Sequence, residues 1–265
     1  VIISNPHYSC YPNFIRFLNA RPVSVKVHEK DGFQYSSEAI KEKISEKTKA
    51  IFINSPSNPT GTLLSKERMQ EIAQLSPYIL SDEIYHGLVY EGTEHSILEF
   101  TNQAFVLNGF SKLFAMTGLR LGYIIAPKIF MRPMQKLQQN FFISANAMVQ
   151  LAGIAALKKA GKDIARMKDI YNQRRKYMIG RLKNMGFGIS VEPTGAFYIF
   201  VNAKHLSADS YELAFDMLEK AHVGVAPGID FGDNGEGYLR FSYANSMENI
   251  EEGMDRLEEY LARYH

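Results

Sequence analysis

The chain has 265 residues, of which 46% are hydrophobic and 22% are charged, and its formal net charge is +2. This balance is ordinary for a globular protein with a large core and two domains, and it argues against a nucleic-acid or membrane partner. The single cysteine, Cys10, excludes an internal disulfide framework and favours a reducing, cytoplasmic location. No apolar run approaches membrane-spanning length, and no basic leader precedes the first apolar residues.

Strand and helix patterns alternate through the first part of the chain. Short apolar runs predict strands at residues 1–3, 23–27, 49–53, 78–80, 104–107 and 123–126. Helical patterns lie between several of them, and Ser65 is placed to cap one helix. This alternation up to about residue 157 predicts a mostly parallel sheet with helices on both faces.

Three polar loops follow predicted strands, at the edge where open α/β sheets bind ligands. Asn58 precedes Pro59 and is held out of the helical region, so its amide can point inward; a plain turn asparagine is the alternative. Asp82 directly follows an apolar strand, where a carboxylate can keep a pyridine nitrogen protonated, or merely cap a helix. Tyr85 can donate a hydrogen bond to a phenolate oxygen, and Tyr8 can present a flat face to a bound ring. The alternative for each is an ordinary packing tyrosine.

Lys112 stands between two apolar runs, and Arg120 follows eight residues later. A buried ammonium loses hydration, so a lysine there is costly unless it has a function. An amine and a fixed guanidinium suit an aldehyde that carries a phosphate, because the amine can form a Schiff base and the guanidinium can bind phosphate oxygens. The alternative is a surface loop with two solvated cations.

In the later half of the chain, strand and helix patterns no longer alternate regularly, which predicts a second, α+β lobe. Helical patterns cover residues 128–140, 147–155 and 163–184, with the 147–155 stripe expected in the core and residues 174–176 on a solvated face. Strands are predicted at residues 189–191, 196–201, 223–226 and 238–242, and Ser246 caps a final helix. Arg240 lies on the last strand and either faces solvent or enters a cleft. In a cleft, the paired N–H donors of its guanidinium would match the two oxygens of an α-carboxylate. We place the domains at residues 1–157 and 158–265.

Residues 108–122 resemble the pyridoxal-phosphate attachment signature of class I/II aminotransferases. The positions that fit are Gly109, Phe110, Ser111, Lys112, Ala115, Met116, Gly118, Arg120, Leu121 and Gly122. Four further sequence segments resemble motifs of the family and occur in the same order: Asn58-Pro59-Thr60-Gly61, Ser81-Asp82-Glu83-Ile84-Tyr85, Gly195-Ala196-Phe197-Tyr198 and Leu239-Arg240-Phe241-Ser242-Tyr243-Ala244. The resemblance runs through the whole chain and is nearest to the prokaryotic aspartate or aromatic aminotransferase branch.

This resemblance implies a fold-type I pyridoxal-phosphate transferase with a smaller C-terminal α+β domain. It also implies one role for each candidate residue: Lys112 as the Schiff-base lysine and acid/base, Arg120 on the phosphate, Asp82 on the pyridine nitrogen, Asn58 and Tyr85 on the ring oxygen, Tyr8 stacked on the ring, and Arg240, with Asn58, on the substrate carboxylate. No metal is expected. The expected partners are an amino acid and a 2-oxo acid.

Two departures accompany the resemblance. The family's upstream segment, with its phosphate loop, has no counterpart here, and Gly109 stands where some relatives carry serine. We therefore expect residues 1–265 to belong to a longer homodimeric protein, and to bind cofactor poorly and lack activity alone. The alternatives are a C–S β-lyase or cyclase on the same scaffold, a ligand-sensing domain of a transcription regulator, and an inert scaffold.

Overall fold

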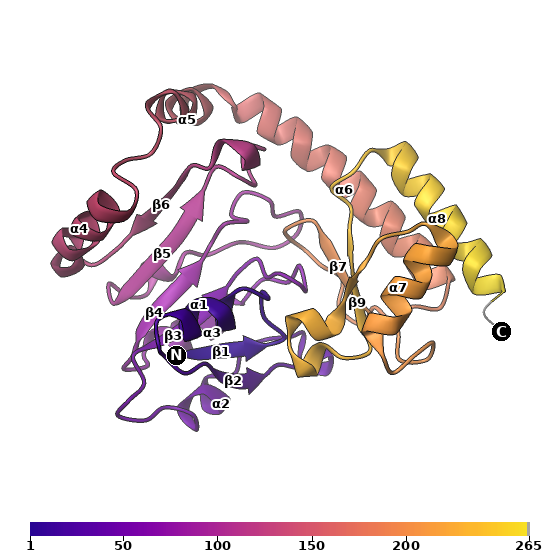
Figure 1. Ribbon diagram of the computed structural model, residues 1–265, viewed down its shortest axis with the longest axis horizontal. Coiled ribbons are helices and arrows are strands. Elements are labelled where there is room, and N and C mark those ends of the chain that lie inside the picture. The colour runs from indigo at the N-terminus through magenta and orange to yellow at the C-terminus, as the bar shows by residue number, and fades with distance from the viewer. Residues whose placement is uncertain (264–265) are drawn as a thin grey trace.

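The larger of two sheets organises the first half of the chain (Figure 1). The computed structural model describes residues 1–263. The strands of this sheet lie in the order β2-β1-β3-β4-β5-β6, and all neighbours are parallel except β5 and β6. Their bounds are β1 (Ile2–Asn5), β2 (Val23–Lys26), β3 (Ala50–Asn54), β4 (Tyr78–Asp82), β5 (Ala104–Gly109) and β6 (Gly122–Ile125).

Helices cover this sheet on both faces because successive strand residues point to opposite sides. Ile2 belongs to an apolar cluster with residues of α2 (Ser37–Lys41) and α3 (Lys66–Ala73). The next residue, Ile3, packs against α1 (Tyr11–Phe17) on the other face. The predicted cap of α3 is confirmed, since the Ser65 hydroxyl accepts a hydrogen bond from the Arg68 backbone amide.

The strand order reverses beside β1, which has β2 on one side and β3 on the other. Only the pair Ile2 and Ile51 joins β1 to β3 in register, whereas five pairs join β3 to β4. The carboxyl ends of β1 and β3 are therefore not bound together as a ladder. Open α/β sheets bind ligands in such a crevice at the point of reversal.

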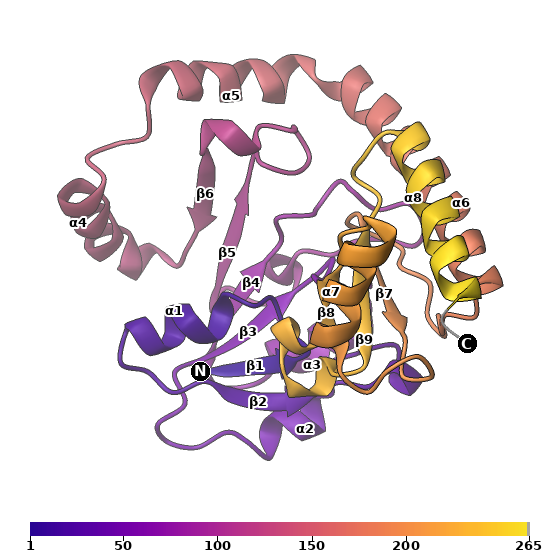
Figure 2. The same cartoon turned by 45° about the vertical axis from the view of Figure 1, so that its right-hand side comes forward.

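The second sheet is antiparallel, in the order β7-β9-β8, and α-helices pack on the face that carries its apolar core. Its strands are β7 (Tyr198–Asn202), β8 (Ala226–Pro227) and β9 (Tyr238–Ser242). The helices are the C-terminal half of α6 (Gly161–Asn184), α7 (Ser210–Ala221) and α8 (Met247–Ala262). Figure 2 shows α6 running from the end of α5 (Ala147–Lys159) to this lobe, where α8 lies beside it. The mostly parallel sheet and the smaller α+β part are confirmed, while a boundary at residue 157 stays a prediction.

Two predicted strands differ in the structure. Residues 189–191 form no strand; nearby, Gly188 makes only an isolated bridge to Asn202. The strand expected at residues 223–226 is reduced to β8, Ala226–Pro227. Proline has no backbone N–H to donate, which limits the ladder at this edge of the sheet.

The apolar side chains of β6 and α5 are more exposed than predicted. Tyr123, Ile124 and Ile125 are 46–47% exposed, and Leu151 on α5 is 67% exposed. With α4 (Met131–Phe141), β6 lines a depression of about 790 Å³. The expectation of buried positions here is wrong for residues 1–263. The approach of α5 to Leu121 and Phe110 buries Gly153 and leaves Leu151 exposed. The described residues include no helix both long and apolar enough to cross a bilayer.

Arg175 corrects the prediction that residues 174–176 form a solvated face. Its side chain is 1% exposed, donates from Nη1 to the Pro193 carbonyl at 2.7 Å, and pairs with Glu91. Its guanidinium also lies over the Tyr90 ring at 5.5 Å. Arg175 thus ties α6 to the segment that leads into β7, a contact between distant parts of the chain.

Candidate active site

A cavity of about 470 Å³ lies at the carboxyl ends of β3, β4 and β5, where they meet the small sheet. It is lined by Tyr8, Tyr11, Asn54, Asn58, Asp82, Ile84, Tyr85, Leu107, Asn108, Lys112, Tyr198 and Arg240. The structure therefore brings together every candidate residue from the sequence except Arg120.

Asp82 occupies the end of β4 and its carboxylate is held on both oxygens. Oδ2 accepts from the Tyr11 hydroxyl at 2.7 Å, and Oδ1 accepts from the Ile84 amide at 3.1 Å. Burial raises the pKa of Asp82, against the hydrogen bonds from Tyr11 and Ile84 and the attraction of Lys112. The carboxylate is thus oriented and short of a cationic partner, which suits it to a protonated ring nitrogen.

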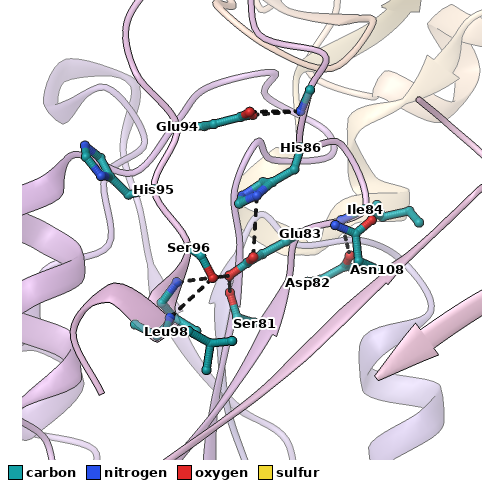
Figure 3. Close-up of polar contacts among 12 residues, drawn as sticks. Ser81, Asp82, Glu83, Ile84, His86, Glu94, His95, Ser96, Leu98 and Asn108 are labelled. Atoms are coloured by element: carbon teal, nitrogen blue, oxygen red, sulfur yellow. Dashed lines mark hydrogen bonds and ion pairs between the residues drawn. The ribbon is translucent and has the colours of Figure 1, made fainter. Parts of the chain in front are cut away.

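A second buried carboxylate, Glu83, fixes the chain just behind Asp82 (Figure 3). Its Oε1 accepts from the Ser81 hydroxyl at 2.9 Å, the Ser96 hydroxyl at 3.2 Å and the Ile97 amide at 3.0 Å. Its charge also raises the pKa of Asp82. Figure 3 shows the two neighbouring carboxylates directed to different sides, so Glu83 anchors the loop and leaves Asp82 to the cavity.

Lys112 follows β5 and brings an amine close to two aromatic rings. Its Nζ lies 5.7 Å from the centre of the Tyr85 ring and 5.5 Å from that of Phe197. Burial lowers the pKa of Lys112, and the charges of Arg240 and Arg120 lower it further, while Asp82 raises it. A lowered pKa makes the neutral, nucleophilic amine more abundant near neutral pH.

The charge of Arg240 should be measurable at Lys112. We expect Arg240→Met to raise the pKa of Lys112 in cofactor-free protein, because it removes a like charge. The pH dependence of Lys112 labelling by trace acetic anhydride, followed by peptide mapping, measures this pKa. Arg240→Lys is the matched control, since it keeps the charge and should shift the pKa less. A labelling midpoint that stays constant in Arg240→Met would contradict this coupling.

Arg240 enters the cleft, which decides between the two orientations that its strand left open. On β9 its neighbours Leu239 and Phe241 belong to the small-lobe core, so alternation sends Arg240 to the opposite face. Its Nη1 donates to Asn58 Oδ1 at 2.7 Å. Its Nε is buried and has no hydrogen-bond partner among the described residues. A guanidinium with an unused donor matches a planar carboxylate.

The tyrosines form an aromatic wall around these polar groups. The Tyr85 and Tyr198 hydroxyls lie 3.0 Å apart, and the Tyr198 ring lies 4.2 Å from the Arg240 guanidinium carbon. Tyr8 meets the Tyr11 ring edge-to-face at 5.4 Å. A hydrogen bond with Cys10, followed by burial, raises the pKa of Tyr8 to about 12. The cavity thus offers flat apolar surfaces beside an amine, a carboxylate and a guanidinium, as an aromatic aldehyde such as pyridoxal phosphate requires.

Arg120 lies outside the cavity lining and is exposed, with its Nη1 donating to the Thr117 carbonyl at 2.9 Å. The nearby departure from the family pattern has a steric reason. A Cβ on Gly109 would lie 2.9 Å from the Leu121 carbonyl oxygen and 3.0 Å from the Gly122 Cα. The close approach of β5 and β6 therefore requires glycine at this position.

Six residues of the cavity lining were not among the candidates from the sequence: Tyr11, Asn54, Ile84, Leu107, Asn108 and Tyr198. Tyr198 could have been found, because it shares a strand face with Phe200 while Ile199 and Val201 face the core. Nothing in the local pattern distinguishes Tyr11 from an ordinary buried helix residue. Phe231, at the end of the short 3-10 turn Gly228–Phe231, does not line the cavity, but its ring contacts the Arg240 guanidinium.

Comparison with known proteins identifies the family to which this chain belongs. The family described as aminotransferase class I and II matches residues 1–257. The chain belongs to the class I and II aminotransferases. These enzymes transfer amino groups and depend on pyridoxal phosphate.

Several relatives of this aminotransferase share more than a third of its sequence. A (5-formylfuran-3-yl)methyl phosphate transaminase of Methanocaldococcus jannaschii is 43% identical over 98% of this chain and 68% of its own. An aspartate aminotransferase of Pyrococcus horikoshii is 42% identical over 98% of this chain and 69% of its own. The crystal structure of an aromatic aminotransferase from P. horikoshii OT3 superposes with a TM-score of 0.94 at 37% identity, covering 98% of this chain and 72% of that one. The fold-type I architecture is thereby confirmed.

Proposed function

We propose that this aminotransferase binds pyridoxal phosphate in the 470 Å³ cavity and moves an amino group from an L-amino acid to a 2-oxo acid. One observation carries the proposal: Lys112, Asp82 and Arg240 line the same cavity although they are far apart in sequence. An amine, a buried carboxylate and a guanidinium with an unused donor are the groups that this reaction needs.

Four residues of the cavity, and Arg120 outside its lining, have proposed contacts with the cofactor. When bound, pyridoxal phosphate supplies a ring that accepts electrons from the reacting α-carbon. The Asp82 carboxylate would hold a proton on the ring nitrogen, since an opposite charge favours the protonated form. The remaining contacts are proposed for Asn58 and Tyr85 at the ring oxygen, Tyr8 against the ring face, and Arg120 at the phosphate.

Lys112 has two proposed tasks, covalent attachment of the cofactor aldehyde and proton transfer. Its lowered pKa favours a neutral Nζ, which can accept the proton of the substrate α-carbon and later return it. The aromatic rings of Tyr85 and Phe197 beside Nζ limit the water that could compete for this proton.

The substrate is proposed to be a dicarboxylic or aromatic amino acid, with Arg240 and Asn58 holding its α-carboxylate. The named relatives include aspartate and aromatic aminotransferases, and the cavity wall is rich in tyrosine. These names do not favour a β-lyase, a cyclase or a sensing domain. We also propose a homodimer in the cytoplasm; the exposed apolar side chains of β6 and α5 support the first, and the single cysteine supports the second.

The reaction can be tested on the full-length protein loaded with pyridoxal phosphate. Aspartate or an aromatic amino acid should convert the absorbance of the bound aldehyde to that of the amine form, and a 2-oxo acid should restore it. Arg240→Lys should keep the cofactor absorbance but lower kcat/KM by roughly 10–100-fold, because an ammonium cannot form two parallel hydrogen bonds. If Arg240→Lys reacts with unchanged kinetics, Arg240 does not bind the carboxylate. No conversion with any amino acid would contradict the proposed function itself.

A further inference from the structure

We propose that Phe231 is a positioning residue, which holds the plane of the Arg240 guanidinium and thereby sets how a substrate carboxylate can bind. The proposal rests on the proposed role of Arg240. Phe231 belongs to the turn Gly228–Phe231, is 3% exposed, and comes from a segment for which the sequence suggested no role.

The guanidinium carbon of Arg240 lies over two aromatic rings. Its carbon is 4.2 Å from the centre of the Tyr198 ring and 4.8 Å from the centre of the Phe231 ring. A cation over an aromatic face is stabilised by the negative charge of the ring face, and more strongly where water is excluded. A second aromatic contact therefore opposes rotation of the guanidinium out of its plane.

This arrangement leaves the carboxylate few directions of approach. Asn58 already accepts from Nη1, and Nε is buried without a partner among residues 1–263. Because the two rings lie within 4.8 Å of the guanidinium carbon, a carboxylate has to approach the guanidinium from the directions that the rings leave open. The orientation of the substrate at its α-carbon thus depends on the ring of Phe231.

Backbone contacts fix the ring of Phe231 independently of Arg240. Its carbonyl accepts from the His7 amide at 2.9 Å, and His7 directly precedes the cavity residue Tyr8. Earlier in the turn, the Ile229 amide donates to the Ser210 hydroxyl at 3.1 Å. On the other side, the Phe200 ring packs edge-to-face against Phe231 at 6.0 Å. Phe231 is therefore held by both lobes, which makes it a firm support for Arg240.

A double-mutant cycle on the loaded full-length enzyme tests this role. Phe231→Leu removes the aromatic face but keeps an apolar side chain, and it should raise KM for the amino acid and the 2-oxo acid about 5–30-fold. The change in kcat should be smaller and the cofactor absorbance unchanged. In an Arg240→Lys background the same substitution should change KM less than about twofold, because the guanidinium it supports is gone.

Controls separate positioning from packing. Phe241→Leu removes a buried ring from the opposite face of β9 and should lower the melting temperature without raising KM. Phe231→Met, with an unbranched side chain, keeps the test available if the leucine variant does not fold. An equal rise in KM with and without Arg240 would overturn the proposal for Phe231. Unchanged KM in Arg240→Lys alone would instead overturn the proposed role of Arg240.

Discussion

Replacement of Lys112 by alanine should lower kcat by roughly 10⁴-fold or more, because it removes both the nucleophilic amine and the proton acceptor. Phe197 and Tyr85 flank Nζ within 5.7 Å, but neither can take over proton transfer at neutral pH. Burial and the Tyr198 contact raise the pKa of the Tyr85 hydroxyl far above its ordinary value. Single-turnover absorbance changes with amino acid in excess give the rate.

The matched control for this variant is Lys43→Ala, since Lys43 is an exposed lysine outside the cavity lining. Its kinetics should equal those of the unaltered enzyme. Borohydride reduction of the loaded enzyme, followed by peptide mapping, should place the cofactor on Lys112. A label on another lysine, or full activity of Lys112→Ala, would show that a different amine does this work.

Asp82→Asn should lower kcat by roughly 10²-fold or more while leaving the protein at least as stable at neutral pH. An amide of the same shape can keep contacts with the Tyr11 hydroxyl and the Ile84 amide. It carries no charge, however, and cannot favour a proton on the ring nitrogen. Kinetics of the loaded enzyme and urea unfolding of the cofactor-free protein test the two halves of this expectation.

The raised pKa of Asp82 determines how the stability difference between Asp82→Asn and the unaltered protein should change with pH. Burial raises the pKa of Asp82 in the folded state, so the folded protein binds this proton more tightly than the unfolded chain. The resulting stabilisation is present below the unfolded pKa of about 4 and is lost as pH rises through the folded value. The stability gain of Asp82→Asn should therefore be greater at pH 7 than below about pH 4. A variant that is less stable at pH 7 and active as before would contradict both arguments.

Local sequence determined much of this protein. Apolar runs of strand length and Ser65 as a helix cap predicted the parallel sheet, because backbone propensity and capping act over a few residues. The same local rules placed Asn58, Asp82 and Lys112 at strand ends. Since parallel strands end at a common edge, their presence in one cavity follows from the topology.

Only the tertiary structure decided which strand faces meet which partners. Alternation shows that Arg240 and Phe241 point to opposite sides of β9, but the packing of α7 and α8 against Phe241 is what sends Arg240 into the cleft. Arg175 looked solvated within a basic run and is buried, because its partners Glu91 and Pro193 lie far away in sequence. Phe231 joins the site through contacts with His7 and Arg240. Local patterns show which residues share a face, whereas long-range packing selects what that face contacts.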